Sequence, residues 1–433
     1  MVFNIARYAF IVTSLFVAAE VSNPGEPGQV TAPRDKQLTI LFAGDIMQHG
    51  PQINSAWDDS TQTYNYNSCF QYIAPIVSSK DIAIANLEVT LAGKPFTGYP
   101  QFSAPDELAV AAGNAGFDIL ATANNHSCDR GDEGVLRTIK VLDSLGMKRT
   151  GTFADSADYR KNHPLIFTQN DIKVALLNYT YGTNGLPFNY PAMVNILEEQ
   201  KVINDLAYTK GLNPDFILVF FHWGNEYELM PTEQQHQLAA VCREHGADAV
   251  IGSHPHVVQP MEYHAADDTT QRNHLLVYSL GNYVSNQRDR YKDGGAMVSF
   301  TLLKTWNRKT IIDPEYHLTW VYTPVEKGKK NYYIVPVNVP YKENQVLASS
   351  DLIKESRQPQ DLPGIGVENN TKPNGNNDNL QSENGILPWF DREAEHRLRN
   401  MDSLDVNKMN TFLNDTRERL NQWPNAISEA DYK

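Results

Sequence analysis

The 433-residue sequence has little cysteine, no excess of positive charge and an N-terminal apolar run too short to cross a bilayer. Its three cysteines are too few and too scattered for a disulfide framework, and the odd count leaves at least one thiol free. Lys and Arg total 37 against 51 Asp and Glu, which gives a formal net charge of −14. This balance argues against a nucleic-acid partner or an anionic membrane surface. A bound cation is more in keeping with it.

The N-terminal segment predicts export. Arg7 precedes an uncharged apolar run of 12 residues from Tyr8 to Ala19, whereas a membrane helix needs about 20. Small residues end the run before Glu20, so we predict a signal peptide over residues 1–19. The protein would then be periplasmic or lie at the cell surface. If the segment is an uncleaved anchor instead, it would provide the membrane contact.

Composition divides the rest of the chain. Residues 20–37 are rich in Pro and Gly and are predicted to be a linker. Between residues 38 and 303, short apolar runs alternate with amphipathic helical patterns, which is typical of an α/β domain. Residues 304–350 are predicted to form β-hairpins packed on that domain. Residues 351–387, rich in Asn, Gly and Pro, are predicted to be a flexible linker, and residues 388–433 a helical tail.

Hydrophobic periodicity places the main elements. The strands expected in the α/β region are Leu38–Ala43, Ile82–Leu87, Asp118–Ala121, Ile172–Asn178, Phe216–Phe221, Ala249–Ile251 and Leu275–Leu280. One helix is expected to begin around Asp132 and to end before Gly146, and another to begin at Thr232, which opens a Thr-x-x-Gln capping box, and to stop at Gly246. Further strands, without helices between them, are expected at Met297–Leu303, Ile311–Ile312, Leu318–Tyr322 and Tyr332–Val337.

Polar side chains collect where these strands end. In open α/β sheets, ligands bind outside the carboxyl ends of the strands. The candidate donors at that edge are Asp45, Glu88, Asn125, His222, His254 and His256. A lone Asp after a strand is commonly a turn or cap residue, and a lone His is commonly a hydrogen-bonded core residue. Recurrence of such residues at the strand ends favours one metal site over independent coincidences.

The donor types suit divalent metals, which need several oxygen or imidazole ligands on rigid elements. Two metals about 3.5–4 Å apart require a bridging carboxylate, for which Glu88 is the candidate. Glu226 follows His222 by four residues and is a candidate to orient an imidazole or bind a substrate amine. Asn282 and Arg288 follow another strand end, where an arginine could hold a carboxylate or phosphate. The alternative for Arg288 is a solvated surface charge.

Short motifs occur at the strand ends in the order Gly44-Asp45-Ile46-Met47, Asn86-Leu87-Glu88, Ala123-Asn124-Asn125-His126, His222-Trp223-Gly224-Asn225-Glu226-Tyr227, Gly252-Ser253-His254-Pro255-His256 and Ser279-Leu280-Gly281-Asn282-Tyr283. Together they resemble the CapA-type capsule-synthesis family, a branch of the calcineurin-like metallophosphoesterase superfamily. The resemblance covers about residues 38 to 303. It implies an αββα four-layer sandwich that holds two divalent metal ions, of Mn, Zn or Fe, at the strand ends.

The resemblance also implies roles for single residues. Asp45 and His256 resemble ligands of one metal, and Glu88 takes the place of the bridging carboxylate. The residues that resemble ligands of the second metal are Asn125, His222 and His254. His126 resembles the histidine that donates a proton to the leaving group, a role that suits an imidazole with a reference pKa of about 6.5.

One position departs from the superfamily pattern. Typical members begin with Asp-x-His, whereas this chain has Met47 in place of the histidine. A thioether is a poor ligand for the hard metals of such sites. The first metal therefore has one protein donor fewer, unless water or His49 replaces it.

Two functions are compatible with these features. The first is an exported metal-dependent hydrolase, phosphoesterase-like, that acts on a phosphoester or an anionic surface polymer such as poly-γ-glutamate, together with capsule-synthase components. The alternative is a non-catalytic accessory subunit that binds the polymer and keeps a vestigial metal site. Met47 and the Asn-rich linker before the helical tail motivate the alternative.

Overall fold

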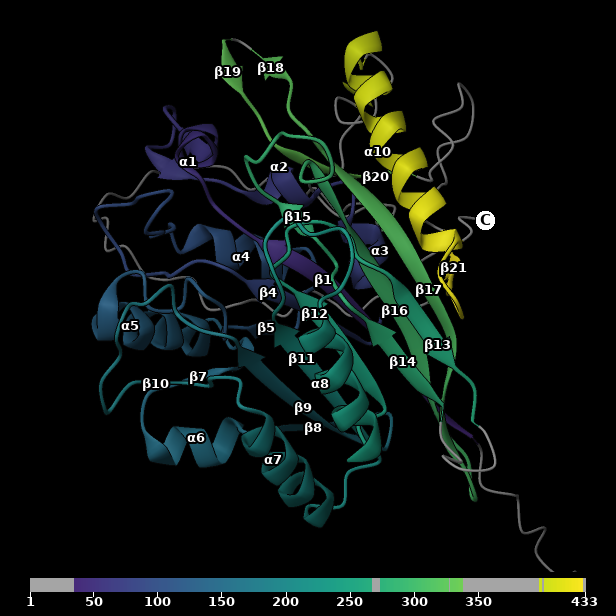
Figure 1. Ribbon diagram of the computed structural model, residues 1–433. Helices are drawn as coiled ribbons and strands as arrows, with labels where there is room; N and C mark the ends of the chain where they lie inside the picture. The colour runs from purple at the N-terminus through teal and green to yellow at the C-terminus, as the bar shows by residue number, and fades with distance from the viewer. Residues whose placement is uncertain (1–34, 267–272, 327, 338–396, 399–400, 431–433) are drawn as a thin grey trace, which may run out of the picture. The chain divides into compact units, whose positions relative to one another are not determined.

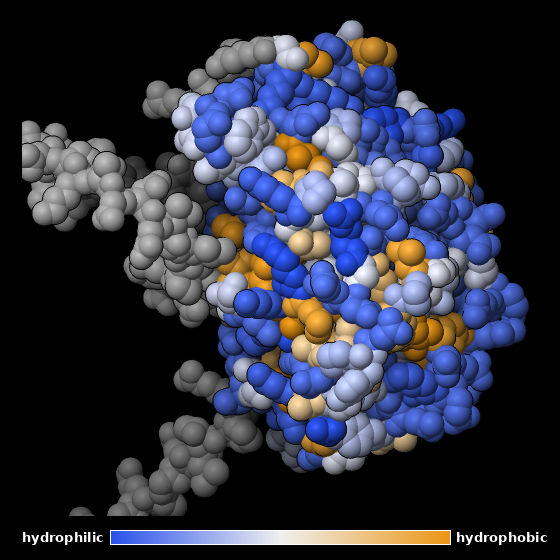
Figure 2. Space-filling model, turned by 90° about the vertical axis from the view of Figure 1, so that its left-hand side faces the viewer, coloured by the Kyte–Doolittle hydropathy of each residue, from blue (hydrophilic) through white to orange (hydrophobic). Residues whose placement is uncertain are grey.

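The computed structural model describes residues 35–266, 273–326, 328–337, 397–398 and 401–430 (Figure 1). The predicted signal peptide, the linker 351–387 and nearly all of the linker 20–37 lie outside these ranges. No helix within the described ranges is both long enough and apolar enough to span a bilayer. The face shown in Figure 2 is predominantly hydrophilic, with hydrophobic residues in small separate groups.

The larger sheet is built around β1. In spatial order its strands are β20 (Tyr333–Pro336), β17 (Lys309–Tyr322), β16 (Gly294–Lys304), β1 (Lys36–Ile46), β4 (Ile82–Leu87), β5 (Ile119–Ala121) and β6 (Lys148–Thr150). From β1 to β6 the strands are parallel, and from β1 to β20 they are antiparallel. Two short strands, β15 (Asn282–Val284) and β21 (Ser428–Glu429), also pair with β1 and β17 respectively.

The smaller sheet has a parallel centre. Its strands in order are β13 (Met261–His264), β14 (His274–Val277), β12 (Ala249–Ser253), β11 (Phe216–His222), β9 (Ile172–Thr180) and β8 (Leu165–Gln169). The central four are parallel, and β13 and β8 pair antiparallel at the edges. Every residue of β11 is buried, as expected for a strand covered on both faces.

Successive side chains along each strand point to opposite faces of the sheet, so the hydrophobic core forms separate layers on the two faces. Ile40 and Phe42 of β1 face the smaller sheet, where the Phe42 and Phe220 rings meet edge to face at 5.3 Å. The intervening Leu41 faces the opposite way, toward α4 (Glu107–Asn114) and α5 (Gly131–Ser144). On the far side of the smaller sheet, Val219 packs with α7 (Glu199–Gly211) and α8 (Glu233–Glu244), which lie over that sheet in Figure 1. The predicted αββα sandwich is confirmed.

Short elements complete the described fold: α1 (Gly50–Ala56), β2 (Trp57–Asp58), β3 (Thr63–Tyr64), α2 (Asn67–Phe70), α3 (Ala74–Ser78), β7 (Thr152–Phe153), α6 (Ser156–Asn162), β10 (Met193–Val194), β18 (Val325–Glu326) and β19 (Lys329–Lys330). The cysteines Cys69, Cys128 and Cys242 are free and buried. Burial raises the pKa of each thiol, so none is an activated nucleophile.

The chain after Lys304 continues the larger sheet. Where the sequence predicts separate strands at Ile311–Ile312 and Leu318–Tyr322, one strand, β17, runs through both. The pairing of β17 with β16 shifts register there, and Asp313, just before Pro314, has a left-handed φ of +50°. This bulge lets the strand pass the proline without losing its pairing on either side. The described part of the expected extension 304–350 thus forms strands of the sheet itself, with the small hairpin β18–β19.

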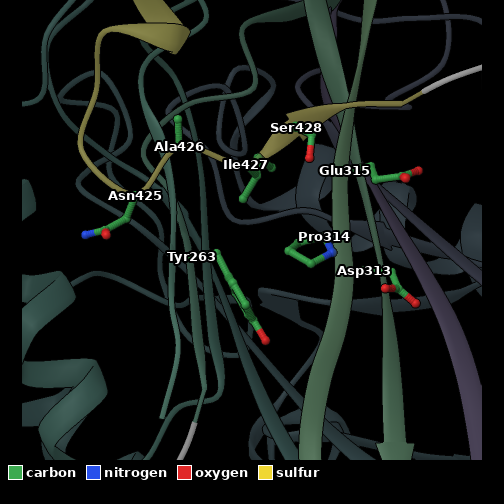
Figure 3. A pocket seen from close by; sticks show the side chains of 8 residues that line it. All are labelled: Tyr263, Asp313, Pro314, Glu315, Asn425, Ala426, Ile427 and Ser428. Atoms are coloured by element: carbon green, nitrogen blue, oxygen red, sulfur yellow. The ribbon is translucent and has the colours of Figure 1, made fainter. Parts of the chain in front are cut away.

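The predicted helical tail is present as α10 (Ser403–Asn421), which lies beside β17 and β20 in Figure 1. Its buried side chains Met409, Phe412 and Leu413 join the same hydrophobic cluster as β17. After the helix, β21 pairs with β17. Figure 3 shows the segment 425–428 facing Tyr263 and Pro314 across a surface pocket of about 430 Å³. None of the eight residues that line this pocket is one of the predicted donors.

Truncation of Phe412 should show how much the tail stabilises the sheet. Phe412 is 2% exposed and contacts the β16–β17 region beside Gly294. We expect Phe412→Ala to lower the free energy of unfolding by about 3–5 kcal/mol, through lost burial and the cavity left behind. Urea denaturation measures this change. The control Asn410→Ala, on the exposed side of α10, should change the free energy by less than about 0.5 kcal/mol.

Candidate metal centre

Carboxyl ends of strands from both sheets meet at one place in the structure. In the larger sheet, Asp45 at the end of β1 pairs with Asn86 of β4, and Glu88 follows directly after β4. In the smaller sheet, His222 ends β11 and pairs with Ser253, the last residue of β12. Because the two sheets pack face to face, these strand ends lie next to each other.

The predicted donors form overlapping groups around Glu88. The first group consists of Asp45, Glu88 and His256, and the second consists of Glu88, His222 and His254. Within each group, the ligand atoms all lie within 4.8 Å of one another. His256 Nδ1 lies 3.1 Å from Asp45 Oδ2, and His256 Nε2 lies 3.8 Å from Glu88 Oε1. His222 Nε2 lies 3.5 Å from the same Glu88 oxygen. Glu88 therefore occupies the position between the two groups.

The amide of Asn125 joins the second group. Asn125 Oδ1 lies 3.0 Å from His222 Nε2, and its Nδ2 is buried without a hydrogen-bond partner among the described residues. The His254 ring centroid lies 4.7 Å from that of His222. An oxygen and two imidazoles thus converge on the His222 side of Glu88.

Unsatisfied polar atoms at this centre fit a bound cation. Glu88 is completely buried, and neither carboxylate oxygen has a hydrogen-bond partner among the described residues. Burial, with the neighbouring Asp45 charge, holds the pKa of Glu88 well above its usual range. His254 Nδ1 is also buried and unpartnered. A buried carboxylate without a partner is costly, and a divalent ion bound by these oxygen and nitrogen atoms would remove that cost.

The imidazoles are held in the form that binds metals. Burial, reinforced by the neighbouring histidine charges, keeps the pKa of His222 well below its usual value. Burial and the charge of His256 lower the pKa of His254 to about 3. Both rings are therefore neutral at pH 7, with a nitrogen lone pair available for a metal.

Surrounding side chains orient these donors. Asn86 Nδ2 donates to Asp45 Oδ1 at 2.8 Å and lies 3.3 Å from His222 Nδ1. Ser253 Oγ lies 3.1 Å from the same ring nitrogen. These contacts at Nδ1 turn His222 Nε2 toward Glu88, as outer hydrogen bonds do for metal-binding histidines.

The backbone around the donors is close-packed and locally strained. Asp45 N donates to Gly281 O at 3.0 Å, and a Cβ on Gly44 would lie 2.1 Å from that oxygen. Only glycine therefore permits this approach. His254 and His256 have φ of +98° and +59°, in the left-handed region that non-glycine residues rarely adopt. Strain of this kind concentrates at functional sites, where the surrounding structure enforces it.

His126 is positioned by a partner that the sequence analysis missed. His126 Nδ1 lies 2.7 Å from Asp129 Oδ2, and Asp129 also accepts from the Phe102 backbone N–H at 2.7 Å. The Phe102 ring packs against the imidazole at 4.6 Å. Asp129 thereby engages Nδ1 and leaves Nε2 as the other functional nitrogen of His126. The three-residue spacing of His126 and Asp129 is the feature of the sequence that could have indicated this contact.

The three predicted substrate-binding residues lie in different surroundings. A ligand atom of Glu226 lies within 4.8 Å of those of His254 and His256. Asn282 Nδ2 instead donates to Gln287 Oε1 and Lys292 O, both at 2.8 Å, and so fixes the loop after β15. Arg288 in that loop places its guanidinium 5.4 Å from the centre of the Trp320 ring.

Burial lowers the pKa of Arg288, whose side chain is half-buried. The role of Arg288 in holding a carboxylate or phosphate stays a prediction.

Met47 packs among apolar side chains. It is 2% exposed and belongs to the hydrophobic cluster on the helix-covered face of the larger sheet. His49 packs against Phe102, and its Nδ1 lies 3.3 Å from both Gln52 Oε1 and Asn286 N. Burial lowers the pKa of His49 to about 4. His49 is in none of the groups of ligand atoms found among the described residues.

Comparison with known proteins agrees with the resemblance predicted from the motifs. Residues 39–287 match the family described as "Bacterial capsule synthesis protein PGA_cap". "Capsule biosynthesis protein CapA" of Bacillus anthracis is 27% identical over 308 residues, which cover 67% of this chain and 70% of that protein. "PGA biosynthesis protein CapA" of Bacillus subtilis (strain 168) is 26% identical over 318 residues, covering 70% of this chain and 78% of that protein.

Among solved structures, the calcineurin-like phosphoesterase YfkN from Bacillus subtilis aligns with 66% of this chain and 91% of its own, at 13% identity and a TM-score of 0.39. The match to the family model spans more than half of the sequence. The chain therefore belongs to the bacterial capsule synthesis protein PGA_cap family.

Proposed function

We propose that this protein is an exported, metal-dependent hydrolase that cleaves a phosphoester or amide bond during synthesis or remodelling of a surface polymer such as poly-γ-glutamate. Family membership and the two relatives named for capsule and PGA biosynthesis support the polymer. The main observation in support of a metal-dependent hydrolase is that Glu88 is buried without a hydrogen-bond partner among the described residues and lies between two groups of ligand atoms. Export to the periplasm or cell surface rests on the N-terminal segment.

The chain's own residues divide the work of such a reaction. Divalent ions bound here would polarise the oxygen of the scissile group and lower the pKa of a water molecule toward about 7. Glu88 and the histidines hold the centre rigidly, because they sit at the ends of buried strands. His126 gives a proton from Nε2 to the leaving group, while Asp129 engages Nδ1 and keeps the ring oriented.

The open side of the centre is suited to an anionic substrate. Tyr181 and Tyr227 are 44% and 46% exposed, and their rings lie 4.5 Å from His254 and 6.0 Å from His256 respectively. Lys292 Nζ lies 4.3 Å from the centre of the Tyr227 ring and pairs with the exposed Asp289 carboxylate at 2.7 Å. Aromatic faces and an ammonium group at the rim would contact an acidic polymer in a protein whose net charge is negative.

Replacement of His254 tests the hydrolase directly. We expect purified protein to contain Mn, Zn or Fe, and His254→Ala to lose metal and to lower turnover at least about 100-fold, as removal of a ligand or its support does. Elemental analysis and hydrolysis of a p-nitrophenyl phosphodiester and a γ-glutamyl peptide measure both. His245→Ala is the control, because His245 ends α8 before β12 begins, at the opposite end of that strand.

A metal-free wild-type protein without activity on either substrate would contradict the hydrolase. Binding of poly-γ-glutamate that survives His254→Ala, in the absence of metal and turnover, would instead establish the non-catalytic accessory.

A further inference from the structure

A third group of ligand atoms lies on the solvent side of the centre. A Glu226 oxygen and one nitrogen each of His254 and His256 all lie within 4.8 Å of one another. His254 and His256 are buried, whereas Glu226 is exposed on the loop after β11. We propose that Glu226 is a metal ligand that closes the centre from its exposed side. This inference rests on the metal centre of the proposed function.

The loop that carries Glu226 is fixed against the two histidines. Tyr227 N donates to the carbonyl oxygen of Pro255, between His254 and His256, at 2.7 Å. Tyr227 adopts a left-handed φ of +67° to make this contact. A non-glycine residue in that conformation is strained, and here the hydrogen bond to the His-Pro-His segment enforces it. The carboxylate is therefore held over the imidazoles by the backbone, not by a flexible side chain alone.

The loop is also anchored at its start. Gly224 has φ of +85°, and a Cβ there would lie 2.6 Å from Gln235 Oε1. Gln235 belongs to the capping box that opens α8, and its Nε2 donates to Gln259 Oε1 at 3.0 Å. Gln259 in turn donates to the backbone oxygens of Glu228 and Met230. Both ends of the loop are thus tied to the segment that follows β12, which limits where Glu226 can point.

Charge and donor number favour ligation by Glu226. Asp45, Glu88 and Glu226 bring three carboxylates to the overlapping groups of ligand atoms. Divalent cations bound among these carboxylates would offset their negative charge. The group that contains Asp45, Glu88 and His256 offers three ligand atoms, whereas a protein-bound transition metal usually takes at least four ligands. Glu226 approaches the shared ligand His256 and would add a carboxylate oxygen, a ligand of a suitable class for Mn or Fe.

Measuring metal binding by the variant Glu226→Gln distinguishes a metal ligand from a residue that contacts only the substrate. Purified wild type, Glu226→Gln, Glu226→Asp and the control Glu228→Gln are stripped with chelator and titrated with Mn²⁺. Glu228 is an exposed carboxylate on the same loop, outside the groups of ligand atoms found among the described residues. Calorimetry gives stoichiometry and affinity, and electron paramagnetic resonance separates a coupled Mn pair from a single ion.

We expect wild type and Glu228→Gln to bind two ions with a coupled spectrum. Glu226→Gln should lose at least about tenfold in the affinity of one ion and show the spectrum of isolated Mn²⁺. Glu226→Asp should lie between them, because a shorter carboxylate retains the oxygen donor.

Unchanged stoichiometry, affinity and spectrum in Glu226→Gln would overturn the ligand role, and a raised KM for a substrate with a free amine would then assign Glu226 to substrate binding. The proposed hydrolase would stand in that case. Wild type that binds no Mn²⁺, Zn²⁺ or Fe²⁺ would instead remove the metal centre, and with it both proposals.

Discussion

Glu88→Gln should abolish binding of a metal pair and lower turnover by about 10⁴-fold, which corresponds to about 5.5 kcal/mol of transition-state stabilisation. The substitution keeps the size of the side chain. A neutral amide, however, offers one weakly donating oxygen where the carboxylate offers two, and it cannot bridge the groups containing Asp45 and His222. Elemental analysis of the variant and its kcat on the phosphodiester measure the effect.

The same variant carries its own folding control. In wild type without metal, the buried Glu88 carboxylate has no hydrogen-bond partner among the described residues. Glu88→Gln should therefore unfold in chelator at a temperature equal to or above that of wild type. Added metal should stabilise only wild type, by about 2.7 kcal/mol at 100 times Kd. A variant that retains two ions, or that melts far below wild type in chelator, would contradict the position assigned to Glu88.

Local sequence signals were sufficient for most of the elements that position the centre. The apolar run of β4 gives the predicted bounds Ile82–Leu87, and the Thr232–Gln235 capping box opens α8 as expected. These signals work because hydrophobic runs and caps act within a few residues of the chain. By contrast, β17 passes through Pro314 because a bulge relieves the missing N–H, and that compensation depends on pairing with β16.

Only part of the candidate centre could be predicted from the sequence. The strand ends indicated residues that the structure brings together, because parallel strands carry their carboxyl ends to one edge of a sheet. The aromatic residues around the centre could not be predicted from the sequence. Tyr181 contacts His254 from the loop after β9, and Tyr227 lies near His256 because its backbone bonds to Pro255. Arg288 follows a strand end as predicted, yet the loop fixed by Asn282 carries it onto Trp320. Such placements depend on contacts between distant segments.

His126→Ala should leave the metal content unchanged and lower turnover by about 10²–10⁴-fold on substrates with poor leaving groups, the range typical of general acid catalysis. His126 pairs with Asp129 and lies outside the groups of ligand atoms found among the described residues. Its loss should therefore remove proton donation without removing a ligand. A p-nitrophenolate leaving group departs without a proton, so its release should slow much less than that of an alkyl alcohol.

This dependence on the leaving group separates proton donation from a structural role, which would slow all substrates alike. Asp129→Asn provides the matched variant, because it keeps His126 but replaces the carboxylate that engages Nδ1 and accepts from the Phe102 N–H. It should show the same selectivity for poor leaving groups with a smaller loss, since the imidazole is present but less firmly oriented. Equal slowing of p-nitrophenyl and alkyl esters in both variants would mean that the leaving group takes its proton from water, and that the His126–Asp129 pair serves the fold around Phe102.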